Sequence, residues 1–451
     1  MNEVSSGKRT LWSRAADMAA KAPPERNRYV DFLRAFSILA VVIGHWLVAA
    51  PYMKDGAVQG GHLLGILPWS QWLTWGFQVM PLFFLVGGFS NGMSWAANRR
   101  SNGSYSDWFV NRIQRLINPV LPLFLIWTLF ALFGTVLGVE RRVVALAAQL
   151  ALIPVWFLSV YLIVSALVPY THRVWKRYGL ASFWMLVAGA ILVDLLSIRF
   201  GVPHINFANF AFVWLAVHQL GYAWGDGHFA SPAKAALWGA GGLIALGLLV
   251  GLGPYPVAMI GVPGSDLSNS MPPTLALLAL GIAQTGIALA LEPAARRMLE
   301  SARLWTGVVL VNGMIMTIYL WHLTAFVLVL VIAWLMGGVG LNVAPGSGAW
   351  WMARPLWFGL YLIALTPLIM LFAGFEQARR TEKDRPAPQI PTWRRLIALL
   401  LICIGLAATA AISIASPMGV TGVRLWVVAL PFIGTALAGF GPAYDLSQRL
   451  R

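Results

Sequence analysis

Charged residues are scarce in this 451-residue chain: they make up 11% of it, whereas 59% is hydrophobic. Soluble globular proteins carry roughly 25% charged residues. The mean hydropathy is +0.72. A water-soluble fold of this length could not bury so much apolar surface, so that class is excluded and lipid must solvate much of the chain. The 22 tryptophans suit this setting, because aromatic rings anchor at membrane interfaces.

Cysteine and metal-binding motifs are almost missing. Cys403 is the one cysteine, so an intramolecular disulfide is excluded. The seven histidines show no H-E-x-x-H or comparable spacing, and no phosphate-cradling G-x-x-x-x-G-K-[ST] loop is present. We therefore expect no bound metal and no tightly bound cofactor.

Acidic residues are few: 16 of them stand against 32 lysines and arginines, which gives a net charge of +16. The basic residues are dispersed over short loops rather than gathered on one domain, so we predict no nucleic-acid partner. Residues 1–28 are polar and basic, and are too long and too charged for the start of a signal peptide. We interpret them as a cytoplasmic tail.

Long apolar runs dominate the rest of the chain. A transmembrane helix needs about 20 apolar residues, and the runs of that length predict an all-α, polytopic membrane bundle of about twelve helices. The ninth run is overlong and is expected to begin with an interfacial turn. The predicted spans are roughly 31–52, 70–95, 117–138, 146–169, 181–199, 207–225, 234–252, 273–291, 307–337, 351–373, 396–415 and 423–442.

The positions of lysine and arginine test this count. With these spans, all but six of the 32 basic residues fall on the side of the N-terminus. The six exceptions are Lys54, Arg141, Arg142, Arg199, Arg354 and Arg424. Because positive charge accumulates on the cytoplasmic side, both termini are predicted to be cytoplasmic, in a plasma or inner membrane.

The longest internal loop on the predicted cytoplasmic side, 374–395, separates ten helices from a final pair. We therefore divide the chain into a cytoplasmic N-terminal tail (1–28), a membrane core (29–380), a cytoplasmic linker (381–395) and a C-terminal two-helix extension with a short tail (396–451).

Two ionisable residues share one face of the first span. Arg34 and His45 are eleven residues apart, which is three helical turns or roughly 16 Å along the axis. An ionisable residue inside a span is a functional hypothesis by default. The alternative is that Arg34 snorkels to phosphate headgroups and that His45 hydrogen-bonds a neighbouring helix.

Short motifs on successive spans follow one order and together resemble the membrane-bound acyltransferase 3 family over about residues 28–380. One departure is Gly87-Gly88, where many relatives have serine-glycine. The motifs are Arg34 and His45 separated by ten residues, Phe83-Phe84-Leu85-Val86-Gly87-Gly88-Phe89, Phe109 with Arg112, Arg115 and Pro119, Trp156-Phe157-Leu158, Ile318-Tyr319-Leu320-Trp321-His322, and Glu376 at the end of the tenth span.

The resemblance implies an acyl-CoA donor. Arg112 and Arg115 are three residues apart, so on a helix they project to one side, and their guanidinium groups suit the phosphates of such a donor. The alternative is that they only mark topology, as Arg99 and Arg100 do. His45 would act as general base on an acceptor hydroxyl. Arg34 lies too far along the helix to reach that centre, which favours a donor-binding or structural role.

Three further ionisable groups are predicted to be buried, and the roles of two of them stay open. Asp194 is predicted at the depth of His45 and either orients its imidazole or pairs with Arg199 near the outer surface. His322 lies mid-span and either hydrogen-bonds within the core or lines the cavity. His218 is interpreted as structural.

These observations predict an enzyme that moves an acyl group, most often acetyl in the resembling family, from cytoplasmic acyl-CoA to a hydroxyl acceptor. The expected acceptor is a cell-envelope glycan, a glycolipid or another lipid-linked sugar. The alternative is a twelve-helix secondary transporter without acyl transfer. Against it, the loop between the sixth and seventh spans, 226–233, is short, and the long loop follows the tenth span.

Overall fold

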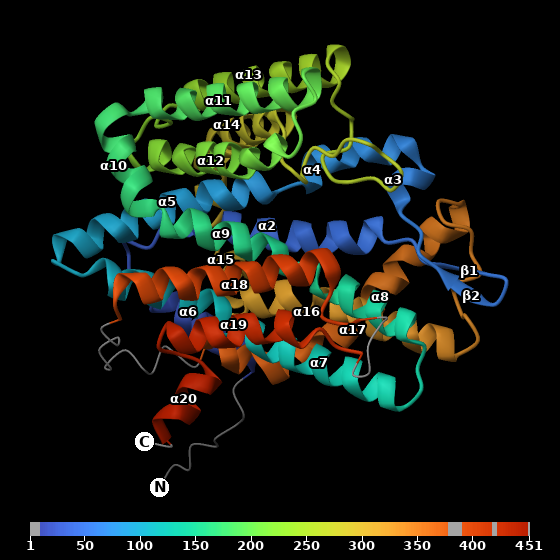
Figure 1. Cartoon of the computed structure of the whole chain (residues 1–451). Helices are drawn as coiled ribbons and strands as arrows, with labels where there is room; N and C mark the ends of the chain where they lie inside the picture. The colour runs from blue at the N-terminus through green and yellow to red at the C-terminus, as the bar shows by residue number, and fades with distance from the viewer. Residues whose placement is uncertain (1–9, 378–389, 417–421, 450–451) are drawn as a thin grey trace, which may run out of the picture.

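The computed structural model describes residues 10–377, 390–416 and 422–449, and it is a bundle of roughly parallel and antiparallel helices (Figure 1). One short antiparallel hairpin, β1 (Tyr52–Lys54) and β2 (Ala57–Gln59), projects at one end. The helices are α1 (Leu11–Ala20), α2 (Arg28–Val48), α3 (Leu63–Ile66), η1 (Pro68–Leu73), α4 (Thr74–Phe77), α5 (Met80–Arg100), α6 (Tyr105–Ile117), α7 (Val120–Val136), α8 (Arg141–Leu152), α9 (Val155–Ala166), α10 (Val168–Tyr178), α11 (Leu180–Asp194), η2 (Leu195–Arg199), η3 (Ile205–Ala208), α12 (Asn209–Gly225), α13 (Pro232–Leu252), α14 (Leu275–Met298), α15 (Ala302–Asn312), α16 (Ile315–Leu335), α17 (Gly348–Gln377), α18 (Thr392–Ile412), α19 (Leu425–Leu437) and α20 (Pro442–Arg449).

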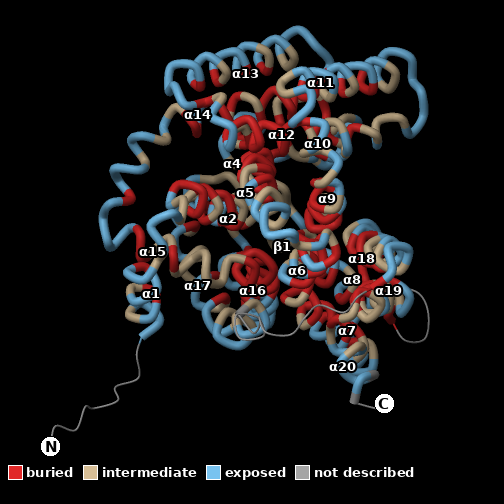
Figure 2. The backbone as a smooth tube through the Cα atoms, turned by 90° about the vertical axis from the view of Figure 1, so that its left-hand side faces the viewer, coloured by how far each residue is buried: buried red, intermediate tan, exposed pale blue. Residues whose placement is uncertain are grey.

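Within the described residues, ten helical segments are long and apolar enough to cross a membrane, which confirms a polytopic helical bundle. Ten of the twelve predicted spans coincide with these segments. The other two correspond to the shorter helices α12, with 17 residues, and α19, with 13 residues. The count of twelve therefore stays a prediction. The helix α12 lies deep in the bundle and is mostly buried (Figure 2).

Proline breaks two of the spanning segments. Pro119 separates α6 from α7, and Pro154 separates α8 from α9, each as the residue before the second helix. Proline lacks an N–H and is favoured where a helix begins, and at these two points one helix ends and the next one starts. The overlong ninth span is likewise divided, into α15 and α16, at Gly313–Met314. The start of this span, where an interfacial turn was expected, is the separate helix α15.

Glycines let α5 and α12 cross closely. A Cβ on Gly88 would overlap the carbonyl of His218, and a Cβ on Gly221 would overlap that of Leu85. Small residues at helix interfaces are typical of membrane bundles, where close backbone contact drives packing. The departure at Gly87 has a local cause, because a Cβ there would lie 2.8 Å from the Tyr161 ring.

The N-terminal segment predicted as a tail contains the helix α1, which packs against α15 at one edge of the bundle (Figure 2). The buried Trp305 of α15 donates a hydrogen bond from Nε1 to the carbonyl of Ala19, at 3.2 Å. Residues 1–9 lie outside the described part of the chain. The segment before α2 thus contains a ten-residue helix that is docked on α15, with Ala15 and Ala19 buried.

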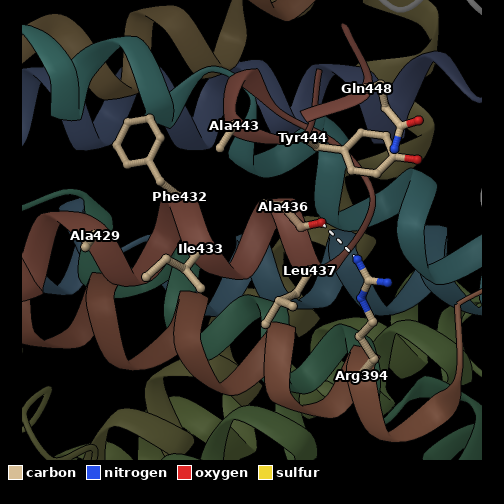
Figure 3. A pocket seen from close by; sticks show the side chains of 9 residues that line it. All are labelled: Arg394, Ala429, Phe432, Ile433, Ala436, Leu437, Ala443, Tyr444 and Gln448. Atoms are coloured by element: carbon tan, nitrogen blue, oxygen red, sulfur yellow. Dashed lines mark hydrogen bonds between the residues drawn. The ribbon is translucent and has the colours of Figure 1, made fainter. Parts of the chain in front are cut away.

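The C-terminal helices pack on the side of the core formed by α7, α8 and α9. The Ser159 hydroxyl of α9 donates to the carbonyl of Cys403 in α18, at 3.0 Å. Of the predicted linker, residues 381–389 lie outside the described residues, and α18 begins at Thr392. A groove of about 540 Å³ lies among α18, α19 and α20, lined by Arg394, Ala429, Phe432, Ile433, Ala436, Leu437, Ala443, Tyr444 and Gln448 (Figure 3).

The predicted orientation can be tested with single cysteines in a Cys403→Ala background. Ala20→Cys and Thr381→Cys are expected to resist an impermeant thiol reagent in intact cells, because the distribution of basic residues predicts that both segments are cytoplasmic. Ala57→Cys, on the exposed hairpin at the other end, is the positive control and should react rapidly. Rapid labelling at position 20 or 381 in intact cells would overturn the orientation.

Candidate functional site

The structure brings two predicted histidines together. His45 of α2 and His322 of α16 are joined by a 2.8 Å hydrogen bond between Nδ1 of His45 and Nε2 of His322. Their rings are parallel within 3°, and the ring centroids are 5.1 Å apart. This separation matches the hydrogen-bond length plus about one ring diameter. The rings therefore lie edge to edge in one plane, with a nearly linear hydrogen bond between them.

The tautomer of each ring follows from the partners of His322. Its Nδ1 lies 2.7 Å from the carbonyl oxygen of Tyr319, which can only accept, so Nδ1 carries the proton. In a neutral ring, Nε2 of His322 is then the acceptor, and Nδ1 of His45 is the donor. This leaves a lone pair on Nε2 of His45. His322 is fully buried, whereas His45 is half-buried, so the free nitrogen is on the more accessible ring.

Three other contacts hold α16 in place around His322. The Trp46 indole, next to His45 in α2, donates to the carbonyl of His322 at 3.1 Å. The hydroxyl of Tyr319 donates to the carbonyl of Pro154 at 2.7 Å. Glu376, at the end of α17, accepts from the backbone N–H of Thr317 at 3.0 Å and from its hydroxyl at 2.9 Å. Glu376 thus caps the start of the helix that carries His322, where a negative charge stabilises the helix through its dipole.

Three predicted arginines converge near the other end of α2. The guanidinium of Arg34 donates to the hydroxyl of Ser90, and Nη1 of Arg112 donates to that of Ser94 at 3.4 Å. Ser90 and Ser94 are one helical turn apart on α5, so the two guanidinium groups are neighbours. Arg115 is exposed and lies within electrostatic range of both arginines. Among the described residues, no ion pair involves Arg112 or Arg115.

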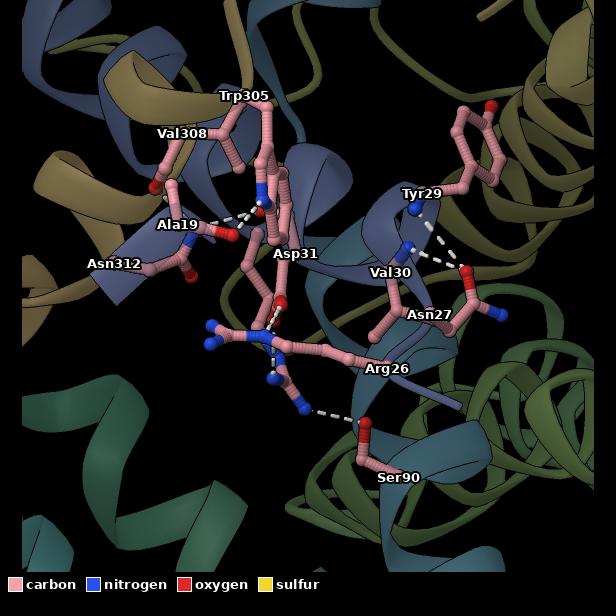
Figure 4. A network of polar contacts seen from close by, with 11 residues as sticks. Ala19, Arg26, Asn27, Tyr29, Val30, Asp31, Ser90, Trp305, Val308 and Asn312 are labelled. Atoms are coloured by element: carbon pink, nitrogen blue, oxygen red, sulfur yellow. Dashed lines mark hydrogen bonds and ion pairs between the residues drawn. The ribbon is translucent and has the colours of Figure 1, made fainter. Parts of the chain in front are cut away.

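Asp31 anchors one edge of this arginine cluster. Its carboxylate accepts from Nε of Arg26 at 2.6 Å and from Nη1 of Arg34 at 3.1 Å. Figure 4 shows Asp31 and Arg26 beside Trp305 of α15, with Ser90 facing them. The segment that carries α1 is therefore tied to the same place as Arg34. The sequence indicated Arg34 but not Asp31, Ser90 or Ser94. The one-turn spacing of the two serines on α5 is the sequence feature that could have indicated a shared polar face.

The arginine cluster and the histidine pair lie at opposite ends of one helix face. Arg34 and His45 both belong to the uninterrupted helix α2, so their axial separation is roughly 16 Å. A phosphate group held by the arginines would therefore need a long, slender extension to reach His45.

Asp194 lies elsewhere. Its carboxylate accepts from Asn209 Nδ2 at 2.7 Å, from the hydroxyl of Tyr255 at 2.8 Å and from the backbone N–H of Leu275 at 2.8 Å. These donors come from α12, from the loop after α13 and from the start of α14. Neither predicted role, orientation of His45 or pairing with Arg199, matches these contacts. The partner that fixes the ring of His45 is His322 instead.

Asp194→Asn is expected to lower the unfolding midpoint while leaving turnover per folded molecule unchanged. The substitution removes a charged acceptor that three donors share, and each such bond is worth about 1.5–3 kcal/mol. Thermal unfolding in detergent, together with an activity assay on the folded fraction, measures both effects. Asp266→Asn, at an exposed loop position, is the matched control. Lost turnover at an unchanged midpoint would return Asp194 to a catalytic role.

His218 is fully buried, and its Nε2 lies 3.1 Å from Nδ2 of Asn91, a buried residue of α5. The pair lies at the close crossing of α5 and α12, one residue along α5 from Ser90. This placement agrees with the structural interpretation of His218.

The chain belongs to the membrane-bound acyltransferase 3 family, because the model of that family, described as an acyltransferase domain, matches residues 27–374. It is therefore a membrane acyltransferase. Searches of curated proteins and of solved structures find no match.

Proposed function

We propose that this acyltransferase moves an acyl group, with acetyl as the first candidate, from cytoplasmic acyl-CoA to a hydroxyl of a cell-envelope glycan, glycolipid or lipid-linked sugar. The observation that carries the proposal is the hydrogen bond from His45 to His322. It holds the ring of His45 with Nε2 free, which is the arrangement that a general base requires.

The arginine cluster supports a CoA donor. Arg34, Arg112 and Arg115 gather positive charge at the end of the bundle predicted to be cytoplasmic. Guanidinium groups bind phosphates with paired N–H donors, and CoA carries several phosphates joined to a long, slender pantetheine arm. With the phosphates at the cluster, the arm follows α2 toward His45 and brings the thioester to the imidazole.

In the reaction, Nε2 of His45 takes the proton from the acceptor hydroxyl as its oxygen attacks the thioester carbonyl carbon. The C–O bond forms and a tetrahedral oxyanion results. The carbon–sulfur bond then breaks, the proton passes from His45 to the departing sulfur, and CoA leaves as the free thiol. His322 acts as a positioning residue: it accepts from Nδ1 of His45 and stabilises the imidazolium formed in between.

The test has two parts. Purified protein in nanodiscs should release CoA thiol from acetyl-CoA when extracts of envelope lipids and glycans are supplied, and a thiol reagent measures that release. Mass spectrometry of envelope lipids and polysaccharides with and without the gene should show a mass difference that equals the acyl group. If folded, membrane-inserted protein releases no CoA thiol and the envelope shows no mass difference, the proposal is contradicted.

A further inference from the structure

The helix α17 carries a buried guanidinium that the proposed reaction leaves unused. Arg354 is 7% exposed, and its Nε has no hydrogen-bond partner. The guanidinium lies 3.5 Å from the centre of the Trp350 ring and beside the Tyr361 hydroxyl. Among the residues that the structure describes, no ion pair includes Arg354.

Contacts of α17 with α2 fix the depth of Arg354 in the bundle. Trp350 shares an apolar cluster with Ala50, just beyond the end of α2. Further along α17, the rings of Phe358 and Tyr361 lie 6.0 Å and 5.2 Å from that of Trp46. Arg354 lies between these contacts on α17, four residues from Phe358 and seven from Tyr361, which is roughly 6–10 Å along the helix axis from the part of α17 that packs on Trp46.

Arg354 therefore lies outward of the histidine pair, so the pair is between Arg354 and the arginine cluster. Trp46 follows His45 in the chain and donates to the carbonyl of His322. Tyr361 thus connects Arg354 to a residue that contacts the pair directly. In the proposed reaction the donor arrives from the side of Arg34, so the acceptor approaches from the side of Arg354.

A buried arginine without an anion is costly, because its desolvation is not offset by a carboxylate. The aromatic face of Trp350 offsets part of that cost. An arginine that only anchors in lipid headgroups would be exposed, as Arg199 is on the same predicted side. Nε of Arg354 is buried and unpartnered, so the planar fork that binds carboxylates and phosphates in pairs keeps an unsatisfied donor here.

We propose that Arg354 binds an anionic group of the acceptor, so that the substrate class is a sugar with a carboxylate or phosphate close to the acylated hydroxyl. Uronic acids and sugar phosphates on lipid carriers have this chemistry. The inference rests on the proposed function, because it takes its direction of approach from the donor and acceptor roles assigned above.

The test compares alkyl sugars that differ only in charge. Octyl glucoside, octyl glucuronide and octyl glucoside 6-phosphate are titrated below their micelle concentrations into protein in phosphatidylcholine nanodiscs. At least one anionic sugar is expected to bind about 10–100-fold more tightly than octyl glucoside, as one charge-assisted pair allows. Arg354→Gln should remove that preference. Arg354→Lys, which keeps the charge without the fork, should retain part of it, and Arg199→Gln should retain all of it.

Equal binding of the three sugars by the wild type, or a preference that survives Arg354→Gln, would overturn the inference. If Arg354 instead served a lipid headgroup, its replacement would change the retention of phosphatidylglycerol and leave sugar binding unaltered, which also overturns it. Affinity for acetyl-CoA in the same samples should not change in Arg354→Gln, which shows that the variant is folded. A wild type that shows the sugar preference but does not bind acetyl-CoA would contradict the proposed function while leaving the anion site intact.

Discussion

His45→Gln is expected to lower acyl transfer by about 10²–10⁴-fold, the usual contribution of a general base. Glutamine can donate to Nε2 of His322 and fill much of the imidazole volume, but it cannot take up a proton at neutral pH. Affinity for acetyl-CoA should stay within about twofold, because the arginine cluster lies three helical turns away. Steady-state transfer at saturating donor and donor titration measure the two quantities separately.

Two control variants distinguish a general base from a packing residue. His204→Gln, at an exposed loop position, makes the same chemical change away from the pair and should leave transfer unchanged. If His45 only packed between helices, glutamine would restore much of the activity that alanine loses. Near-normal transfer by His45→Gln at matched expression would therefore rule out the base role.

His322 should behave as a positioning residue. His322→Gln keeps a side-chain oxygen that can accept from Nδ1 of His45, whereas His322→Ala leaves that donor facing an apolar space. We expect the glutamine variant to retain more transfer than the alanine variant, with the same affinity for acetyl-CoA in both. Equal activity of the two variants would show that the hydrogen bond does not contribute.

The sequence predicted the spacing of residues along one helix, but it did not predict which residues of other helices they contact. Helical rise places Arg34 and His45 three turns apart on one face, and α2 is an unbroken helix as that arithmetic requires. The same arithmetic put Asp194 at the depth of His45. The neighbours of a residue, however, also depend on which helices pack together, and Asp194 faces α12 and α14 instead. Hydropathy runs carry no information on that packing order.

The sequence also failed to predict one short helix and the serines that contact the arginines. α1 has ten residues, half the length that a search for spans detects, and its contact with Trp305 joins segments far apart in the chain. The one-turn spacing of Ser90 and Ser94 is visible in the sequence, but their contacts with Arg34 and Arg112 are visible only in the structure. Motifs identified Arg34, the Arg112/Arg115 pair and the two histidines, whereas tertiary packing was needed to find Asp31 and the two serines.

Arg112→Ala/Arg115→Ala is expected to raise the apparent KM for acetyl-CoA by about 10²-fold or more. Each charge-assisted bond to phosphate is worth about 1.5–3 kcal/mol, and 1.4 kcal/mol corresponds to about tenfold in affinity. The maximal rate at saturating donor should change much less, because neither guanidinium reaches the histidine pair. Donor titration with a thiol-release readout gives both constants.

Arg99→Ala/Arg100→Ala is the matched control for charge and topology. It removes the same charge from the same predicted side of the membrane, at the end of α5, without touching the arginine cluster. Its KM for acetyl-CoA should stay within about twofold of the wild type, since exposed charges contribute little to a distant site in salt.

The sharpest form of the test changes the donor as well as the protein. S-acetylpantetheine carries the thioester and the arm but none of the phosphates of acetyl-CoA. The wild type should prefer acetyl-CoA strongly, whereas the double variant should use the two donors almost equally, because the interaction that separates them is gone. A double-mutant cycle of this kind isolates the phosphate contact from any general loss of fold, since a misfolded variant would lose both donors together. If the double variant keeps the full preference for acetyl-CoA, the phosphates are held elsewhere and Arg112 and Arg115 serve topology, as Arg99 and Arg100 are predicted to do.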